Sequence, residues 1–286
     1  MFTRIDAPAL SESQLYTALH PELSRWFKHR FAHFSPAQLH AVPEILAGQS
    51  LLLTSPTGSG KTLAAFLSVF DFLARAHDSG ELPNGIVAVY VSPLRALAYD
   101  LRKNLQQPAE ELGWAWLRIG ARTGDTTPKE RAVQRRKPPD IFVTTPESLT
   151  LMLSQPAWIA AFKSVRFFIA DELHALAENK RGAMLMVAAE RLEEVVGTPL
   201  QGGRETRRED RSKDGSESRP DQNTRLTRIG LSATISPLET IAEFLVGPGR
   251  PCRIVEITQS KPAKIEVFSP LRDRAYPPAG YTATRV

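Results

Sequence analysis

Three short segments of this 286-residue chain carry side chains that can do chemistry together. Residues 55–62 read Ser-Pro-Thr-Gly-Ser-Gly-Lys-Thr, which combines a flexible backbone with a cation and a hydroxyl. Residues 171–174 read Asp-Glu-Leu-His and place two carboxylates side by side, and residues 232–234 read Ser-Ala-Thr and add two hydroxyls. Glycine-bearing loops with a lysine bind phosphate groups, and adjacent carboxylates can hold a divalent cation and activate water.

The first segment lies between a predicted strand and a predicted helix. The apolar run 51–53 precedes it, and apolar residues at helical spacing begin near Lys61. Gly58 and Gly60 can adopt backbone angles closed to other residues, so that successive N–H groups face one anion. We therefore expect a phosphate-binding loop made of Ser55, Pro56, Thr57, Gly58, Ser59, Gly60, Lys61 and Thr62.

In such a loop, Lys61 reaches the β- and γ-phosphates of ATP and Thr62 places its hydroxyl on Mg²⁺. The start of the helix adds unpaired N–H donors and the positive end of its dipole. Ser55 stands where the strict motif has glycine. The alternative interpretation is a glycine-rich strand–helix turn that binds no nucleotide.

The adjacent carboxylates follow the apolar run 165–170, which is interrupted only by Arg166 and is typical of a buried parallel strand. Ligands of open α/β sheets bind at the carboxyl ends of strands. We expect Asp171 to hold Mg²⁺ and Glu172 to orient and deprotonate the attacking water. His174 is expected to bridge the nucleotide and residues 232–234. A solvated acidic turn is the alternative.

Composition places the chain among globular proteins of a reducing compartment. Hydrophobic residues make up 42% and charged residues 23%, as in ordinary globular domains. Cys252 is the single cysteine, so no internal disulfide can form. The N-terminus shows no apolar signal region, and no run of 18 apolar residues could span a membrane. We expect a cytoplasmic protein with no membrane partner.

The positive charge is concentrated in one segment. The net charge of the chain is +5, and residues 118–137 carry seven basic and two acidic groups, an excess equal to that net charge. A solvated helix face is one interpretation. Because the segment lies between the motifs, we favour the rim of a nucleic-acid site.

Strands and helices alternate along the chain, which predicts an α/β fold with a mainly parallel sheet covered by helices on both faces. The expected strands are 51–55, 86–92, 115–121, 141–145, 165–170, 227–232 and 253–257. The expected helices are 12–29, 36–47, 61–76, 95–111, 128–136, 147–153, 182–195 and 237–245. Residues 201–224 contain no aliphatic or aromatic side chain and are predicted to be a disordered insertion.

The motif set resembles that of superfamily 2 helicases and, within them, the large helicase-related (Lhr) group of DExH helicases. The resemblance covers roughly residues 20–275. It is carried by Gln38, residues 55–62, Ser92-Pro93-Leu94-Arg95-Ala96-Leu97, Thr123-Gly124-Asp125-Thr126, Thr144-Thr145-Pro146-Glu147-Ser148-Leu149, residues 171–174 and residues 232–234.

The resemblance implies a P-loop NTPase domain of the RecA-like type, with further roles for individual residues. Gln38 would read the adenine edge, unless it is a surface residue at a helix start. Ser232 and Thr234 would couple the state of ATP to the nucleic acid, unless they form a simple turn. The residues implied to hold the sugar-phosphate chain are Pro93, Arg95, Thr123, Gly124, Thr145 and Pro146. Thr144, Thr145 and Pro146 also suit a plain strand end and helix start.

We divide the chain into an N-terminal helical lead-in, 1–33, a RecA-like ATP-binding domain, 34–258, and a connector, 259–286, toward a second RecA-like domain. The implied function is the first domain of an ATP-dependent helicase that uses ATP and Mg²⁺ on single-stranded DNA or RNA. Helicases of this type take an arginine finger from the second domain, so we expect a fragment, a truncated product or part of a split enzyme that is weakly active or inactive alone. Two alternatives stay open: a P-loop ATPase of another class, and a non-catalytic nucleic-acid-binding module.

Overall fold

The computed structural model describes residues 1–197 and 226–258, and of residues 95–97 it describes only the backbone. The predicted insertion 201–224 and the predicted connector 259–286 lie outside the described residues. The predicted boundary after residue 33 stays a prediction, although the residues before it contribute a strand to the same sheet as the rest.

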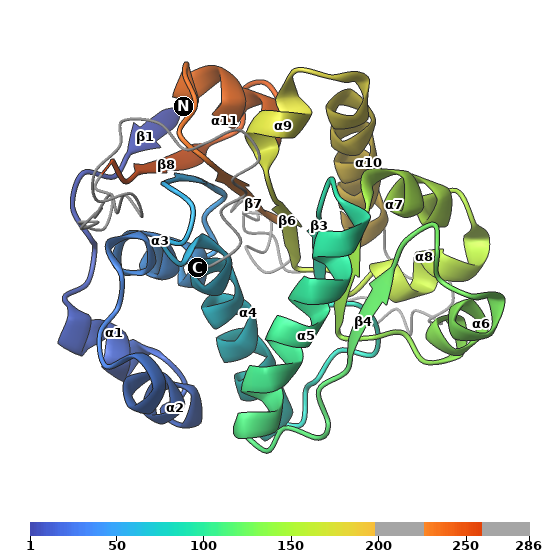
Figure 1. The fold of residues 1–286 in the computed structure, drawn as a ribbon, viewed down its shortest axis with the longest axis horizontal. Coiled ribbons are helices and arrows are strands. Elements are labelled where there is room, and N and C mark those ends of the chain that lie inside the picture. The colour runs from blue at the N-terminus through green and yellow to red at the C-terminus, as the bar shows by residue number, and fades with distance from the viewer. Residues whose placement is uncertain (198–225, 259–286) are drawn as a thin grey trace, which may run out of the picture.

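All described strands belong to one parallel sheet, with the order β1-β8-β2-β7-β6-β3-β5-β4 (Figure 1). The parallel sheet predicted from the alternation of strands and helices is confirmed. Parallel pairing brings the carboxyl ends of the strands to one edge of the sheet, where the chemical motifs follow. The strands are β1 Phe2–Arg4, β2 Leu51–Thr54, β3 Ala88–Val91, β4 Ile119–Arg122, β5 Ile141–Thr144, β6 Phe167–Ala170, β7 Thr227–Ser232 and β8 Cys252–Glu256.

Helices cover both faces of the sheet, as predicted. Buried side chains of α1 to α5 form one apolar cluster with one face, and those of α7 to α11 form a second cluster with the other. None of the described helices is both long and apolar enough to cross a lipid bilayer. The helices are α1 Glu12–Ala18, α2 Pro21–Phe31, α3 Pro36–Leu46, α4 Lys61–Asp78, α5 Arg95–Glu111, α6 Pro128–Arg136, α7 Pro146–Leu153, α8 Pro156–Phe162, α9 Leu173–Ala177, α10 Lys180–Gly197 and α11 Leu238–Val246.

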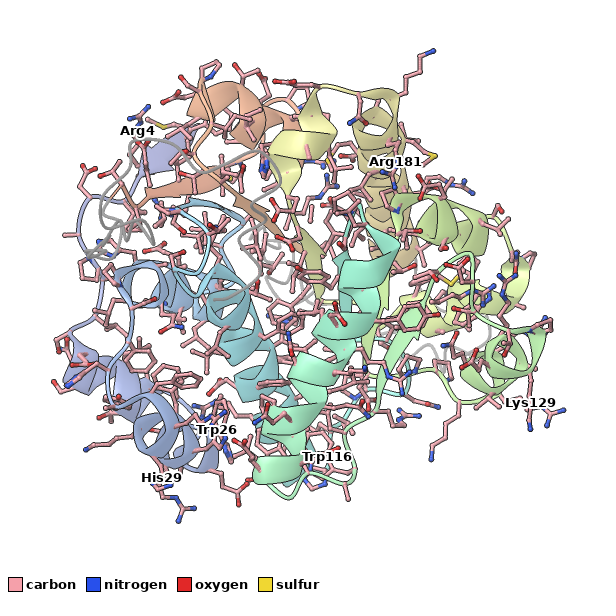
Figure 2. All side chains as sticks on the ribbon, in the orientation of Figure 1. Arg4, Trp26, His29, Trp116, Lys129 and Arg181 are labelled. Carbon is pink, nitrogen blue, oxygen red and sulfur yellow. The ribbon has the colours of Figure 1, made fainter. Side chains whose placement is uncertain are left out.

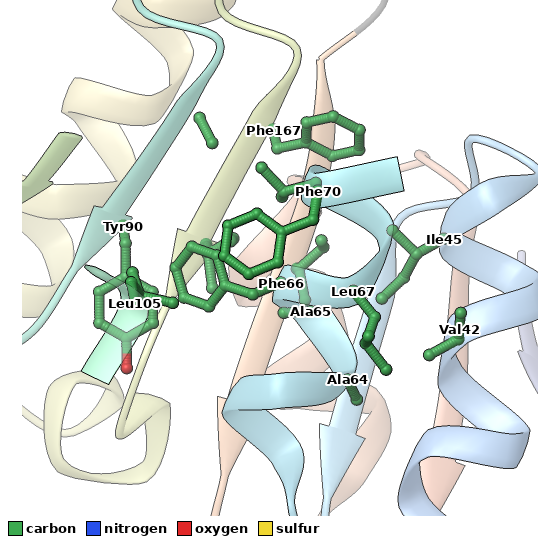
Figure 3. Packing of buried hydrophobic residues seen from close by; sticks show 14 of the residues in the cluster. Val42, Ile45, Ala64, Ala65, Phe66, Leu67, Phe70, Tyr90, Leu105 and Phe167 are labelled. Atoms are coloured by element: carbon green, nitrogen blue, oxygen red, sulfur yellow. The ribbon is translucent and has the colours of Figure 1, made fainter. Parts of the chain in front are cut away.

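The two clusters follow from the two-residue period of the strands. Leu51 and Leu53 of β2 enter the first cluster, whereas Leu52 between them enters the second. Figure 3 shows Phe66 of α4 packed beside Tyr90 of β3, and their ring centroids are 5.5 Å apart. The Tyr90 hydroxyl points away from the phenylalanine rings, toward the carboxyl edge of the sheet.

Several predicted elements were wrong in extent. The predicted helix 12–29 is two helices, because the chain is extended at Leu19 and His20 and Pro21 starts a new helix. Proline disfavours helical backbone angles at the residue before it, here His20, so Pro21 was a sequence signal for this break. The strand predicted at 115–121 is shorter and lies later, at β4. Strand β1 and helices α8 and α9 were not predicted; β1 has three residues and α9 only five.

Candidate nucleotide and nucleic-acid site

The predicted phosphate-binding loop connects β2 to α4, and its two glycines adopt left-handed backbone angles. Gly58 and Gly60 have φ angles of 76° and 89°, in the region that favours glycine. The Nζ atom of Lys61 donates to the carbonyl oxygens of Ser55 at 2.6 Å and Pro56 at 3.0 Å. The cation therefore already points into the loop, where a phosphate could take over its hydrogen bonds. Burial lowers the pKa of Lys61, and the neighbouring carboxylates Glu172 and Asp171 oppose that shift.

Gln38 packs directly against this loop. It is 5% exposed, and its Oε1 atom accepts a hydrogen bond of 2.9 Å from the backbone of Ser35 in the capping box of α3. A Cβ atom added to Gly60 would lie 2.8 Å from the Nε2 atom of Gln38. The structure thus brings Gln38 to the loop, 22 positions away in sequence from Gly60, while its reading of adenine stays a prediction.

Asp171 lies at the carboxyl end of β6 and accepts a hydrogen bond from the hydroxyl of Tyr90. The side chain of Thr62 lies near the same hydroxyl. Burial raises the pKa of Asp171, while the hydrogen bond from Tyr90 and the charge of Lys61 lower it. Tyr90 was not predicted as a site residue; the available signal was one hydroxyl within the otherwise apolar run 86–91.

The hydroxyl of Thr62 and the carboxylate of Asp171 fit a magnesium ion that arrives with a nucleotide, because both converge on Tyr90. Magnesium is usually held by one or two carboxylates together with water and substrate phosphates. The described residues contain no cluster of three or more histidine, cysteine or acidic side chains that could hold a metal alone.

Glu172 adopts a left-handed conformation, with φ 49° and ψ 43°, which is strained for a residue with a side chain. Its Oε2 atom lies 3.3 Å from the Nε2 atom of His174. On the other side of the ring, Nδ1 accepts a hydrogen bond of 3.2 Å from the backbone of Ala233 and lies 3.3 Å from the hydroxyl of Ser232. Since Nδ1 accepts, the proton is on Nε2, facing Glu172.

His174 therefore connects the second and third motifs, which is the arrangement its predicted role needs. Thr234 is exposed and makes no hydrogen bond with any described residue. Its predicted coupling role has no contact to support it in this structure, and Ser232 is the member of the pair that the structure joins to His174.

The segments implied to hold nucleic acid follow β3, β4 and β5 at the same edge. Thr123 and Thr145 are 1% and 2% exposed, and both hydroxyls form local hydrogen bonds. Thr145 caps α7, which begins at Pro146. The backbone of Gly124 is held by a hydrogen bond of 2.8 Å from Arg131. Nucleic acid would therefore meet the backbone here more readily than these two hydroxyls. Arg95 is the first residue of α5, and the structure describes only its backbone.

Arg181, which sequence reasoning missed, joins two of these segments. It donates to the carbonyl oxygen of Pro93 at 2.8 Å and forms an ion pair of 2.6 Å with Glu147. Figure 2 places it at the start of α10, beside α7. The neighbouring Gly182 packs against α9, the short helix that carries His174. The start of α10 therefore touches both the predicted catalytic segment and the predicted nucleic-acid segments.

Replacing Gly182 by alanine is expected to destabilise the fold by about 1–3 kcal/mol, because overpacking a tight contact strains its neighbours. The new Cβ atom would lie 1.9 Å from the carbonyl oxygen of Leu176 in α9. Gly197→Ala is the matched control at the other end of α10, since nothing lies within 4 Å of its Cβ position. Chemical denaturation of both variants measures the effect. Equal stability of the two would contradict the close packing of α9 on α10.

The comparisons with known proteins agree with this geometry. Residues 35–243 match the family model described as DEAD/DEAH box helicase. The ATP-dependent helicase Lhr-Core of Saccharolobus solfataricus is 40% identical over 268 residues, 92% of this chain but 28% of the relative. The Lhr helicase/probable uracil glycosylase of Mycolicibacterium smegmatis is 40% identical over 87% of this chain and 15% of its own length. The chain thus spans less than a third of these relatives.

Among solved structures, the Mycobacterium smegmatis helicase Lhr bound to ssDNA and AMP-PNP is 37% identical, with a TM-score of 0.68 over 85% of this chain and 28% of that one. The DEAD-box helicase Mss116 bound to ssRNA has a TM-score of 0.70 at 19% identity, which shows the shared fold alone. The fold is RecA-like, as the resemblance implied. The chain belongs to the DEAD/DEAH box helicase family.

Proposed function

We propose that this chain is the ATP- and nucleic-acid-binding first domain of an ATP-dependent, Lhr-like helicase, which couples ATP hydrolysis to movement along a strand when complete. One observation carries the proposal: His174 connects Glu172, beside the phosphate-binding loop, to Ser232 and Ala233. His174 thereby links the nucleotide site to the segment that carries the predicted coupling residues, at the same edge of the sheet.

In this proposal, Lys61 and the backbone of residues 55–62 bind the phosphates, and Gln38 lies beside the loop on the adenine side. Thr62 and Asp171 hold Mg²⁺, which neutralises charge on the phosphates when bound. Glu172 takes the proton of the attacking water and keeps its orientation through His174. Tyr90 positions Thr62 and Asp171 relative to each other.

The partners in this proposal are a single strand of DNA or RNA and a second RecA-like domain, in the same protein or in another chain. Sugar-phosphate contacts position a strand without reading its sequence. A cytoplasmic location fits the single cysteine, Cys252, because a chain with one cysteine forms no internal disulfide.

The two alternatives have less support. A P-loop ATPase of another class does not need the link from His174 to residues 232–234. A non-catalytic module does not need Glu172 held in a strained conformation beside Lys61. The family match and the relatives named above favour the helicase domain over both.

The test is nucleotide binding by Lys61→Ala. The substitution removes a charge-assisted contact to phosphate worth about 1.5–3 kcal/mol, so affinity for Mg²⁺–ATP should fall about tenfold or more. Titration calorimetry or a fluorescent ATP analogue measures it. Lys103→Ala, an exposed lysine of α5, is the control and should bind as the parent chain does. Unchanged binding by Lys61→Ala would refute the nucleotide site.

A further inference from the structure

Arg122, the last residue of β4, is a buried cation without a counter-charge. The residue is 6% exposed, and its guanidinium lies 5.0 Å from the ring centroid of Trp158. Within the described residues its guanidinium makes no hydrogen bond and no ion pair. Arg228, which is 2% exposed, shows the usual arrangement, since it forms ion pairs with Glu190 and Glu193. The charge of Arg122 has no counter-charge among the described residues, so its guanidinium is left free to bind an anion.

The surroundings of Arg122 are positive as well. Burial lowers its pKa, and the charges of Arg131 and Arg135 lower it further. Arg131 donates to the carbonyl oxygens of Gly124 and Thr126, both at 2.8 Å, so no acidic side chain neutralises it in these bonds. Arg131 is bonded to the loop that directly follows Arg122, and Arg135 lies one turn further along the same face of α6, so an anion there would relieve the repulsion among these charges.

The position of Arg122 in the sheet indicates which anion would bind there. Arg122 pairs in register with Thr144 of β5, whose hydroxyl donates to the carbonyl oxygen of Arg122 at 2.8 Å. Residues 123–124 directly follow β4, and residues 145–146 directly follow β5. These are two of the segments that the resemblance implies to hold the sugar-phosphate backbone. The cation thus lies between them.

We propose that Arg122, with Arg131 and Arg135, binds one backbone phosphate of the single strand held across β4 and β5. Arginine suits this task because its planar fork donates two hydrogen bonds to a phosphate. Trp158, whose ring lies against the guanidinium, restricts the positions that the fork can take. The inference rests on the proposed function and adds to it a defined phosphate site.

The test compares Arg122→Met, Arg122→Lys and Arg136→Met in the complete protein. Methionine keeps an apolar stem on Trp158 and removes the charge, whereas lysine keeps the charge and loses the fork. Arg136, in the last turn of α6, is exposed and serves as the matched control. The probes are fluorescent oligo(dT) and oligo(rU), titrated at several salt concentrations, with Mg²⁺–ATP affinity and thermal unfolding measured alongside.

Arg122→Met should weaken strand binding by about tenfold or more, the loss of one charge-assisted phosphate contact. The log–log salt slope should become shallower by about 0.7, the value for one phosphate of a single strand. Arg122→Lys should keep the slope and recover part of the affinity, and Arg136→Met should bind more tightly than Arg122→Met. Nucleotide affinity and the unfolding midpoint should stay those of the parent.

Parental affinity and slope in Arg122→Met would overturn the phosphate site and leave the proposed function standing. A lowered unfolding midpoint in both Arg122 variants, with an unchanged slope, would assign Arg122 a structural role and also overturn it. Stabilisation of the parent by inorganic phosphate, lost in Arg122→Met without any change in strand binding, would assign the site to a free anion instead. Absence of strand binding in the parent would refute both proposals.

Discussion

Replacing Glu172 by glutamine is expected to lower the rate of ATP hydrolysis by about 10²–10⁴-fold, the usual contribution of a general base, without weakening nucleotide binding. Glutamine has the shape of glutamate but cannot take a proton from water. Its amide oxygen can still accept from the Nε2 atom of His174, the ring atom 3.3 Å from Glu172. Lys61 and the phosphate-binding loop remain as they are, so affinity should be retained.

Single-turnover hydrolysis in the complete protein, with a saturating strand, measures this rate directly. Glu178→Gln is the matched control, because Glu178 ends the same short helix and is exposed. The control should hydrolyse ATP at the parental rate. If Glu172→Gln also kept that rate, the base would be another group. If it lost nucleotide affinity as well, Glu172 would have a structural role in the loop.

The parallel sheet and the phosphate-binding loop could be predicted because their signals are local. The apolar run 51–53, the glycines 58 and 60 and the helical pattern from Lys61 lie within a short segment, and each constrains its own backbone. The position of Asp171 at a strand end was predictable for the same reason. Pro21 was also a local signal, for the break between two helices, which the predicted helix 12–29 did not take into account.

The contacts that complete the site could not be predicted because their partners are distant in sequence. Tyr90 and Asp171 are 81 positions apart, and Arg181 is 88 positions from Pro93. Nothing in the residues around Arg122 indicates that its side chain is buried over Trp158. Such pairs depend on which strands become neighbours in the sheet, and the order of the strands is decided by packing of the whole domain.

Residues 1–286 alone are expected to hydrolyse ATP about 10³–10⁵-fold more slowly than the complete protein, even with a strand present, which is the contribution of an arginine finger. Charge spreads over the γ-phosphoryl oxygens in the transition state, and Asp171 and Glu172 cannot neutralise it. In the described part of the chain, no arginine is hydrogen-bonded to the phosphate-binding loop or to these two carboxylates. Lys61 is the cation whose charge lowers the pKa of Asp171.

The resemblance to superfamily 2 helicases implies that the second RecA-like domain supplies this arginine, and the relatives named above are more than three times as long as this chain. Steady-state hydrolysis by residues 1–286, before and after addition of the second domain as a separate chain, distinguishes a missing group from a damaged site. Nucleotide affinity should be intact in both cases, and the added domain should raise the rate. Strand-stimulated turnover of about 1 s⁻¹ by residues 1–286 alone would show that this chain neutralises the transition state with its own groups.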